Sequence, residues 1–226
     1  MSCAVTESIA IFGGTFDPIH LGHINAVTLL SERFSFDRIH WVLSARPPHK
    51  NQTSASIEHR FELIKLALAG MPNHVADDTE IRRNAKSYTI DTVEAFQQRY
   101  PNAQLTVIIG GDSVLSLPSW YRYNELIDKV NWLVMSRPGY ELNLSDELQG
   151  RVVSKVDDLL KTRGGSIYLF DESDFNVSST QLRAELGAFA EESAISLKLS
   201  KEFLPNDVFS YIQQQQLYRI APTKSG

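Results

Sequence analysis

The chain has 226 residues, of which 42% are apolar and 22% charged, and its formal net charge is −5. The length fits one α/β domain with a sizeable core, and the composition excludes an intrinsically disordered chain. The acidic balance argues against a general nucleic-acid binder, which is usually basic. Because Cys3 is the one cysteine, an internal disulfide is excluded.

The ends of the chain carry no sign of export or membrane insertion. Residues 1–8 contain no Lys or Arg, so we expect no signal peptide, and no apolar run approaches membrane-spanning length. We therefore expect a cytoplasmic protein with one domain over residues 1–226, in which 219–226 form a loose tail. The sequence leaves oligomeric state open, a homo-oligomer included.

Short apolar runs alternate with amphipathic runs of helical spacing along the chain. Continuously apolar strands are typical of a parallel sheet that is covered on both faces. The pattern predicts an α/β fold with a doubly wound, mainly parallel sheet. The strands that we expect are 9–12, 38–43, 74–81, 105–109, 131–135 and 166–170. The helices that we expect are 24–34, 57–71, 90–100, 124–129 and 208–218, with peripheral helix and loop at 141–165 and a surface helical connection at 185–203.

The segment 13–23 joins the first predicted strand to the first predicted helix. Gly13 and Gly14 let backbone N–H groups approach a ligand with no Cβ in the way. The helix N-terminus adds unpaired donors and a partial positive charge, and His20 and His23 share one helix face. These features favour a phosphate site, against the alternative of a tight turn with two surface histidines. No lysine closes the segment, so it is not a P-loop.

Two loops follow in the chain. Pro47-Pro48-His49-Lys50 is stiff and basic, and alone such a loop is usually solvated surface. The loop 84–89 leads into the third predicted helix, where Thr89 can act as the N-cap. A capping turn also presents backbone N–H groups, which can hold a carboxylate.

Further polar residues follow the later strands. Gly110 and Gly111 end the clearest strand, where open α/β sheets bind ligands, and Asp112 can accept bonds from ribose hydroxyls or cap a helix. Trp120 follows a Pro-Ser turn, so we expect it to be less than deeply buried. Arg137, at the end of the fifth strand, can reach a phosphate or an adenine edge, or form a surface salt bridge.

A second helix start carries hydroxyl groups and a cation. Ser179 and Thr180 precede Arg183 by four and three positions, so the three side chains can face one point. A helix N-terminus with hydroxyl donors and a guanidinium is a further phosphate site. An ordinary capped helix is the alternative.

These stretches resemble the bacterial nicotinate-nucleotide adenylyltransferases of the nucleotidylyltransferase superfamily, over nearly the whole chain. The resemblance implies the Rossmann-like fold of that superfamily. It is carried, in family order, by Gly-Thr-Phe-Asp-Pro-Ile-His-Leu-Gly-His (14–23), Pro-Pro-His-Lys (47–50), Ser-Tyr-Thr (87–89), Gly-Gly-Asp-Ser (110–113), Leu-Pro-Ser-Trp-Tyr (117–121), Arg-Pro-Gly (137–139) and Phe-Asn-Val-Ser-Ser-Thr (175–180).

The resemblance also implies a role for each matching residue. The catalytic residues would be His20, His23 and Arg183. Tyr88, Thr89 and Trp120 would bind the mononucleotide, with Trp120 stacked on its pyridine ring. The residues implied to bind ATP or its phosphates are Gly13, Gly14, Thr15, Lys50, Gly110, Asp112, Arg137, Ser179 and Thr180.

The expected reaction transfers the adenylyl group of ATP to nicotinate mononucleotide in NAD biosynthesis, and releases pyrophosphate. Neither motif contains a protein nucleophile, so positioning and charge neutralisation would carry the catalysis, with Mg²⁺ brought by the ATP phosphates. The alternatives are the same chemistry on nicotinamide mononucleotide, another acceptor such as phosphopantetheine, and a non-catalytic nucleotide sensor.

Overall fold

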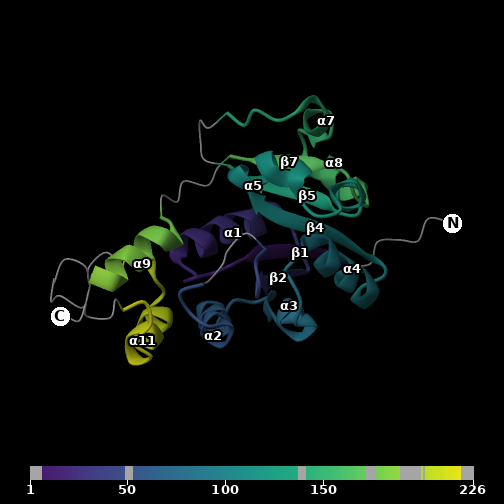
Figure 1. Cartoon of the computed structure of the whole chain (residues 1–226). Helices are drawn as coiled ribbons and strands as arrows, with labels where there is room; N and C mark the ends of the chain where they lie inside the picture. Colours follow the sequence, from purple (N-terminus) through teal and green to yellow (C-terminus); the bar gives the residue numbers. More distant parts are fainter. Residues whose placement is uncertain are drawn as a thin grey trace.

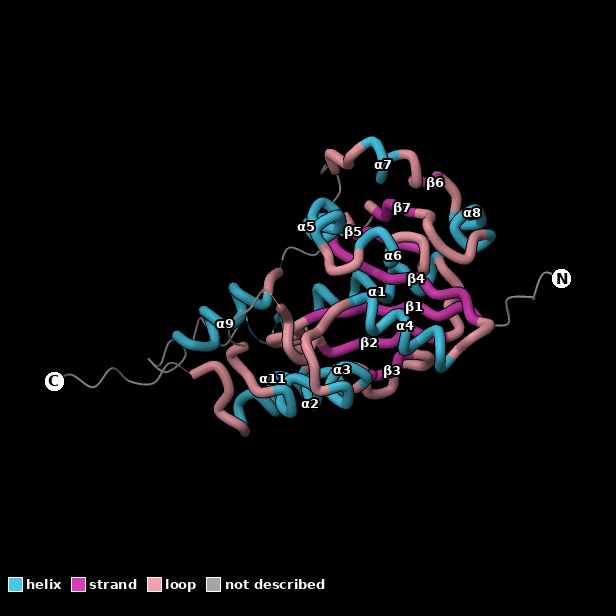
Figure 2. Tube along the Cα trace, turned by 45° about the vertical axis from the view of Figure 1, so that its right-hand side comes forward, coloured by secondary structure: helices cyan, strands magenta, loops and turns pink. Residues whose placement is uncertain are grey.

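We describe a computed structural model of the chain over residues 7–48, 53–136, 141–171, 177–188, 200 and 202–219. In these residues one sheet of seven parallel strands has the order β3-β2-β1-β4-β5-β7-β6, as Figure 2 shows. The strands are β1 (Glu7–Gly14), β2 (Arg38–Leu43), β3 (His74–Asp77), β4 (Ala103–Gly110), β5 (Asn131–Met135), β6 (Val152–Val153) and β7 (Ile167–Phe170).

Helices connect the strands and cover the sheet (Figure 1). In the described part of the chain, none of them is long and apolar enough to cross a membrane. The helices are α1 (Leu21–Arg33), α2 (Ile57–Ala67), α3 (Thr79–Arg83), α4 (Thr89–Arg99), α5 (Gly111–Ser116), the short 3₁₀ helix η1 (Leu117–Ser119), α6 (Tyr123–Leu126), α7 (Asp146–Gln149), α8 (Val156–Lys161), α9 (Ser179–Ala188) and α11 (Asn206–Gln214).

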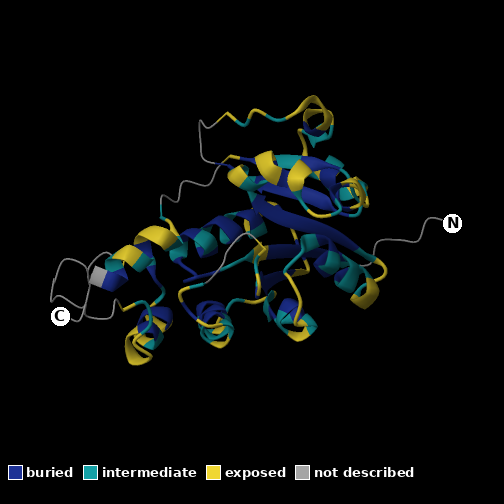
Figure 3. Cartoon of the chain, viewed as in Figure 1, coloured by how far each residue is buried: buried dark blue, intermediate teal, exposed yellow. Residues whose placement is uncertain are grey.

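The sheet has a hydrophobic core on each face, because alternate residues of a strand point to opposite sides. In β1, Ala10 and Phe12 belong to the core that α1, α2, α9 and α11 cover. Ile9 and Ile11 belong to the other core, with α4, α5 and α6. Figure 3 shows the buried strands between helices whose outer surfaces are exposed. The expectation of a doubly wound parallel sheet is therefore confirmed.

The strand order reverses between β1 and β4. These strands pair from Glu7↔Ala103 to Phe12↔Ile108. Beyond that point β1 follows β2 as far as Gly14↔Leu43, and β4 follows β5 as far as Gly110↔Met135. Open α/β sheets bind their ligands at such a switch point, outside the carboxyl ends of the strands. The glycine pairs Gly13-Gly14 and Gly110-Gly111 lie at this position, whereas a third pair, Gly164-Gly165, precedes β7.

The structure differs from the sequence expectation at several elements; the helix expected over 57–71 ends at Ala67, and the helix expected over 208–218 ends at Gln214. The strand expected over 74–81 ends at Asp77, because the Asp77 carboxylate accepts the Thr79 N–H at 2.9 Å as α3 begins. The region 141–165 contains the two-residue strand β6 at the sheet edge, in addition to α7 and α8. Lys50, Arg137 and most of the connection expected over 185–203 lie outside the described residues.

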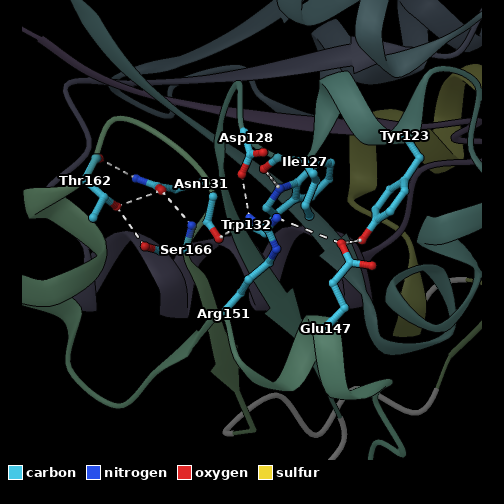
Figure 4. A network of polar contacts seen from close by, with 10 residues as sticks. Tyr123, Ile127, Asp128, Asn131, Trp132, Glu147, Arg151, Thr162 and Ser166 are labelled. Carbon is cyan, nitrogen blue, oxygen red and sulfur yellow. Dashed lines mark hydrogen bonds and ion pairs between the residues drawn. The ribbon is translucent and has the colours of Figure 1, made fainter.

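A polar network fixes the opposite end of the sheet (Figure 4). The side-chain amide of Asn131, at the start of β5, donates to the backbone oxygens of Leu159 and Thr162 at 2.8 Å each. The Asn131 side-chain oxygen accepts the Thr162 hydroxyl at 3.0 Å. These bonds join α8 to β5 and lie away from the switch point, so they serve the fold.

Candidate active site

The loop after β1 has a well-defined shape. The buried Asp17 carboxylate accepts the backbone N–H groups of Ser54 at 2.7 Å and Ala55 at 3.1 Å. The peptide bond from Asp17 to Pro18 is cis, and Phe16 has a φ of 46° in the left-handed region. The loop ends at His20, the N-cap residue of α1. The first motif is thus anchored from both sides before its helix begins.

His20 and His23 lie together at the start of α1. Their rings stack with centroids 3.6 Å apart, and the His20 N–H donates to Nδ1 of His23 at 3.3 Å. Because Nδ1 of His23 accepts, its proton in the neutral form is on Nε2. Burial lowers the pKa of His20 to about 4, and burial together with His20 holds the pKa of His23 well below 6.5. Both imidazoles are therefore neutral near pH 7.

The second motif is bonded to the backbone of the first. Ser179, at the start of α9, donates its hydroxyl to the Pro18 carbonyl at 2.9 Å. Arg183 donates through Nη1 to the Asp17 carbonyl at 2.7 Å and through Nη2 to the Thr180 hydroxyl at 3.2 Å. The N-termini of α1 and α9 therefore meet, although the sequence separates them by about 160 positions.

Gly22 makes the close approach of these two segments possible. A Cβ at this position would lie 2.7 Å from Cγ1 of Val177 and 3.0 Å from Nδ1 of His20. Gly13 is different, because a Cβ there would meet open space. The glycines of the first motif thus have two tasks: Gly22 serves packing inside the protein, and Gly13 leaves room outside it.

From the sequence we expected Arg60 to be either solvated or structural, and the structure buries it. It projects from α2 with 0% of its surface exposed. Its guanidinium donates to the carbonyl oxygens of Thr15 and Ser44 at 2.9 Å each and of Ala45 at 3.1 Å. One side chain therefore fixes the loop after β1 to the loop after β2. Its spacing from Ile64 on the apolar face of α2 was the signal that could have revealed it.

A cavity of about 910 Å³ opens at the switch point. It is lined by Gly13, Gly14 and Thr15 from the first motif and by Tyr88, Thr89 and Trp120 from the region expected to hold a mononucleotide. The size is typical of a small-molecule site. The structure thus brings the two groups of predicted residues to one cavity, at the place that the fold class indicates.

Aromatic rings form one wall of this cavity. The Tyr88 and Tyr121 rings lie 4.5 Å apart at 33°, and Tyr121 is 54% exposed. Trp120 is half-buried, and its ring meets Trp132 edge-on at 6.2 Å. Flat faces at a cavity wall suit a planar ring ligand.

The other predicted residues have different positions. Thr180 and Arg183 line a separate hollow of about 630 Å³, together with Ser54 and Tyr218. Gly110 ends β4, and Asp112 is exposed in the first turn of α5. His20, His23 and Ser179 lie where the two motifs meet. In the described residues, no cluster of three or more His, Cys, Asp or Glu side chains could hold a metal ion.

Known proteins resemble this chain in sequence and in structure. The family model described as cytidylyltransferase-like matches residues 11–185. A protein of Shigella boydii named "probable nicotinate-nucleotide adenylyltransferase" is 36% identical over 216 residues, which cover 93% of this chain and 98% of that protein. An Escherichia coli protein of the same name is 35% identical with the same coverage.

The fold resembles that of a solved structure as well. The nicotinic acid mononucleotide adenylyltransferase of Plasmodium falciparum, complexed with NaAD, aligns with a TM-score of 0.73 at 19% identity. The alignment covers 94% of this chain and 97% of that one. At this identity the likeness concerns the fold.

Proposed function

The chain belongs to the cytidylyltransferase-like family, and within it to the nicotinate-nucleotide adenylyltransferases, and from this membership we propose that it adenylates nicotinate mononucleotide with ATP. The products are nicotinate adenine dinucleotide and pyrophosphate, in the biosynthesis of NAD. The acceptor phosphate oxygen forms a bond to the α-phosphorus of ATP. The bond from that phosphorus to the bridging oxygen of the β-phosphate breaks, and pyrophosphate leaves.

One observation carries the proposal: the Arg183 guanidinium and the Ser179 hydroxyl hold the start of α9 against the loop that begins α1. Two helix N-termini then face the same region, and each supplies N–H donors and a partial positive charge. A triphosphate chain needs several donors and positive charge along its length. Phosphoryl transfer needs little else from the protein, because positioning and charge stabilisation provide most of the rate.

The residues take the following roles in this proposal. His20 and His23 donate hydrogen bonds as neutral imidazoles to the oxygens of the reacting α-phosphate. Thr180 and Arg183 hold the pyrophosphate that leaves. The ATP contacts continue through Gly13, Gly14, Thr15, Ser179, Gly110, Asp112, Lys50 and Arg137.

The mononucleotide occupies the aromatic end of the cavity. Its pyridine ring stacks on Trp120, and its ring substituent faces Tyr88 and Thr89 at the start of α4. ATP enters as its Mg²⁺ complex, so the metal is part of the substrate. We further propose that residues 1–226 act as one domain and that the enzyme works in the cytoplasm.

The test measures pyrophosphate release from Mg-ATP with nicotinate mononucleotide, nicotinamide mononucleotide or phosphopantetheine, each in a separate reaction. We expect the highest kcat/KM with nicotinate mononucleotide. If kcat/KM were higher with one of the other two acceptors, that acceptor would be the substrate instead of nicotinate mononucleotide. If the protein bound ATP but released no pyrophosphate in the presence of any of these acceptors, it would be a nucleotide sensor and not an enzyme of this class.

A further inference from the structure

The turn before α4 is fixed by its backbone. The Lys86 carbonyl accepts the Tyr88 N–H and the Arg83 guanidinium, both at 3.1 Å. At Ser87, the N–H donates to the Arg46 carbonyl and the hydroxyl oxygen accepts the Arg46 N–H, both at 3.0 Å. The turn is thus bonded to α3 on one side and to the loop after β2 on the other. The Cα of Lys86 consequently has a fixed position at the cavity.

The Lys86 side chain, in contrast, has no partner among the residues that the structure describes. It is exposed and borders the cavity, and within the described chain no hydrogen bond or ion pair holds its ammonium. Several other lysines are paired: Lys65 with Glu62, Lys129 with Glu94, and Lys161 with Asp158. A cation at a cavity, with a fixed backbone and with no counter-ion in the described part of the chain, is available to a ligand.

The other charged group at the cavity does not neutralise this cation. Among the described lining residues, Lys86 is the cation and Glu80 the acid. Glu80 is only 6% exposed and accepts the Thr92 hydroxyl at 2.6 Å. Burial raises the pKa of Glu80. The Glu80 carboxylate is thus bonded to Thr92, and within the described residues it forms no ion pair with Lys86.

The position of Lys86 indicates which part of a ligand it meets. It precedes Tyr88, the N-cap of α4, by two residues, and Tyr88 stacks with Tyr121 on the aromatic wall. Tyr88 makes no side-chain cap bond to the helix. A planar ring against this wall would direct an acidic substituent toward both the helix N-terminus and the ammonium. An uncharged carboxamide would be attracted much less strongly by the helix N-terminus and by the ammonium.

We propose that Lys86 binds the carboxylate on the pyridine ring of the mononucleotide and thereby selects nicotinate over nicotinamide. This inference rests on the proposed function, since it names the determinant of the acceptor at the same site. Lys86 is a specificity residue in this assignment. The α4 N-terminus supplies the remaining attraction, so removing the lysine reduces the preference without abolishing it.

The experiment compares Lys86→Met with the wild type in the full chain. Methionine keeps an unbranched apolar stem and removes the charge. Dissociation constants for nicotinate and nicotinamide mononucleotide are measured separately by isothermal titration calorimetry. We expect Lys86→Met to raise the dissociation constant of nicotinate mononucleotide by about threefold to tenfold. This is the range expected for the loss of one partly exposed ion pair. The nicotinamide value should not change.

Two variants complete the test. Lys86→Arg keeps the charge and should keep most of the preference, whereas Lys161→Met removes an exposed lysine away from the cavity and should leave both constants unchanged. Equal weakening of both mononucleotides, or no weakening, would overturn the assignment. So would failure of the wild type to bind either. Binding with this selectivity but no pyrophosphate release would uphold the assignment and refute the proposed reaction instead.

Discussion

The Arg183 guanidinium donates a 2.7 Å hydrogen bond to the backbone carbonyl of Asp17, which lies 166 positions earlier in the chain. The bond joins α9 to the loop that precedes α1. Because the acceptor is a backbone carbonyl, the contact depends on the shape of that loop. Arg183 thus acts on the geometry of the site as well as on its charge.

Arg183→Lys separates these two contributions. Lysine keeps the positive charge but has a single ammonium, which cannot reproduce the bonds to both Asp17 and Thr180. We expect the free energy of unfolding to fall by about 1–2 kcal/mol and kcat for pyrophosphate release to fall by about tenfold or more. Chemical denaturation and steady-state kinetics measure the two effects. Arg82→Lys, at an exposed pair with Asp78, serves as control. Unchanged stability of Arg183→Lys would show that the bond is not a tether.

Replacing either Gly22 or Gly13 by alanine adds one methyl group, and we expect opposite effects at the two positions. Gly22→Ala places a Cβ 2.7 Å from Val177, so it should destabilise the fold by about 1–3 kcal/mol. Gly13→Ala meets open space, so its stability should lie within about 0.5 kcal/mol of the wild type, while its KM for ATP rises. Thermal denaturation and ATP titrations distinguish the two. Normal ATP kinetics in Gly13→Ala would remove that backbone from the ATP site.

His23→Asn tests the role of the imidazole while keeping a hydrogen-bond acceptor for the His20 N–H. The variant also loses the edge-on contact of His23 with the Phe16 ring at 5.3 Å, so a modest loss of stability is expected. We expect kcat to fall by about hundredfold, as when one donor to a developing charge is removed. Pyrophosphate release under saturating substrates measures this. Turnover close to that of the wild type would contradict the catalytic assignment.

His20 should make the fold sensitive to mild acid. Its pKa is about 4 in the folded chain against an ordinary 6.5, so the unfolded chain takes up the proton first as the pH falls. The free energy of unfolding is therefore not reduced by His20 above pH 6.5, and it falls as the pH is lowered toward 4. The loss between pH 7 and pH 5 is about 2 kcal/mol. His20→Asn, which retains a favourable N-cap, should lose less over the same interval. Urea denaturation at both pH values gives the difference, and equal losses in the two proteins would exclude His20 as the source.

Regular periodicity made most of the fold predictable. The strands β2 and β5 have the predicted bounds of 38–43 and 131–135, because both are mainly apolar runs that turn residues follow. The two-residue strand β6 gave no such signal. The strand expected over 74–81 is too long, because the Asp77 carboxylate starts a helix where apolar content alone favoured extension.

The residues of the candidate site could be proposed from the sequence, but their contacts could not. The family resemblance implied that Gly13, Gly14 and Thr15 share one function with Tyr88, Thr89 and Trp120, and the structure brings these residues to one cavity. The sequence did not reveal that Ser179 donates to a backbone carbonyl, because such a bond depends on the shape of the loop and leaves no pattern in the residue types. Nor did spacing reveal the neutral state of His20, which results from burial by residues distant in the sequence.

The bonds of Arg60 have a consequence for how such a sequence can diverge. All three of its acceptors are backbone carbonyls, so Arg60 imposes a position on Thr15, Ser44 and Ala45 without requiring particular side chains there. Side chains at the rim of the cavity can then be substituted during evolution, and the preferred substrate can change with them. The backbone shape of the rim is kept as long as Arg60 is kept. In a screen for altered acceptor use, position 44, which lines the cavity, should accept substitutions that position 60 does not.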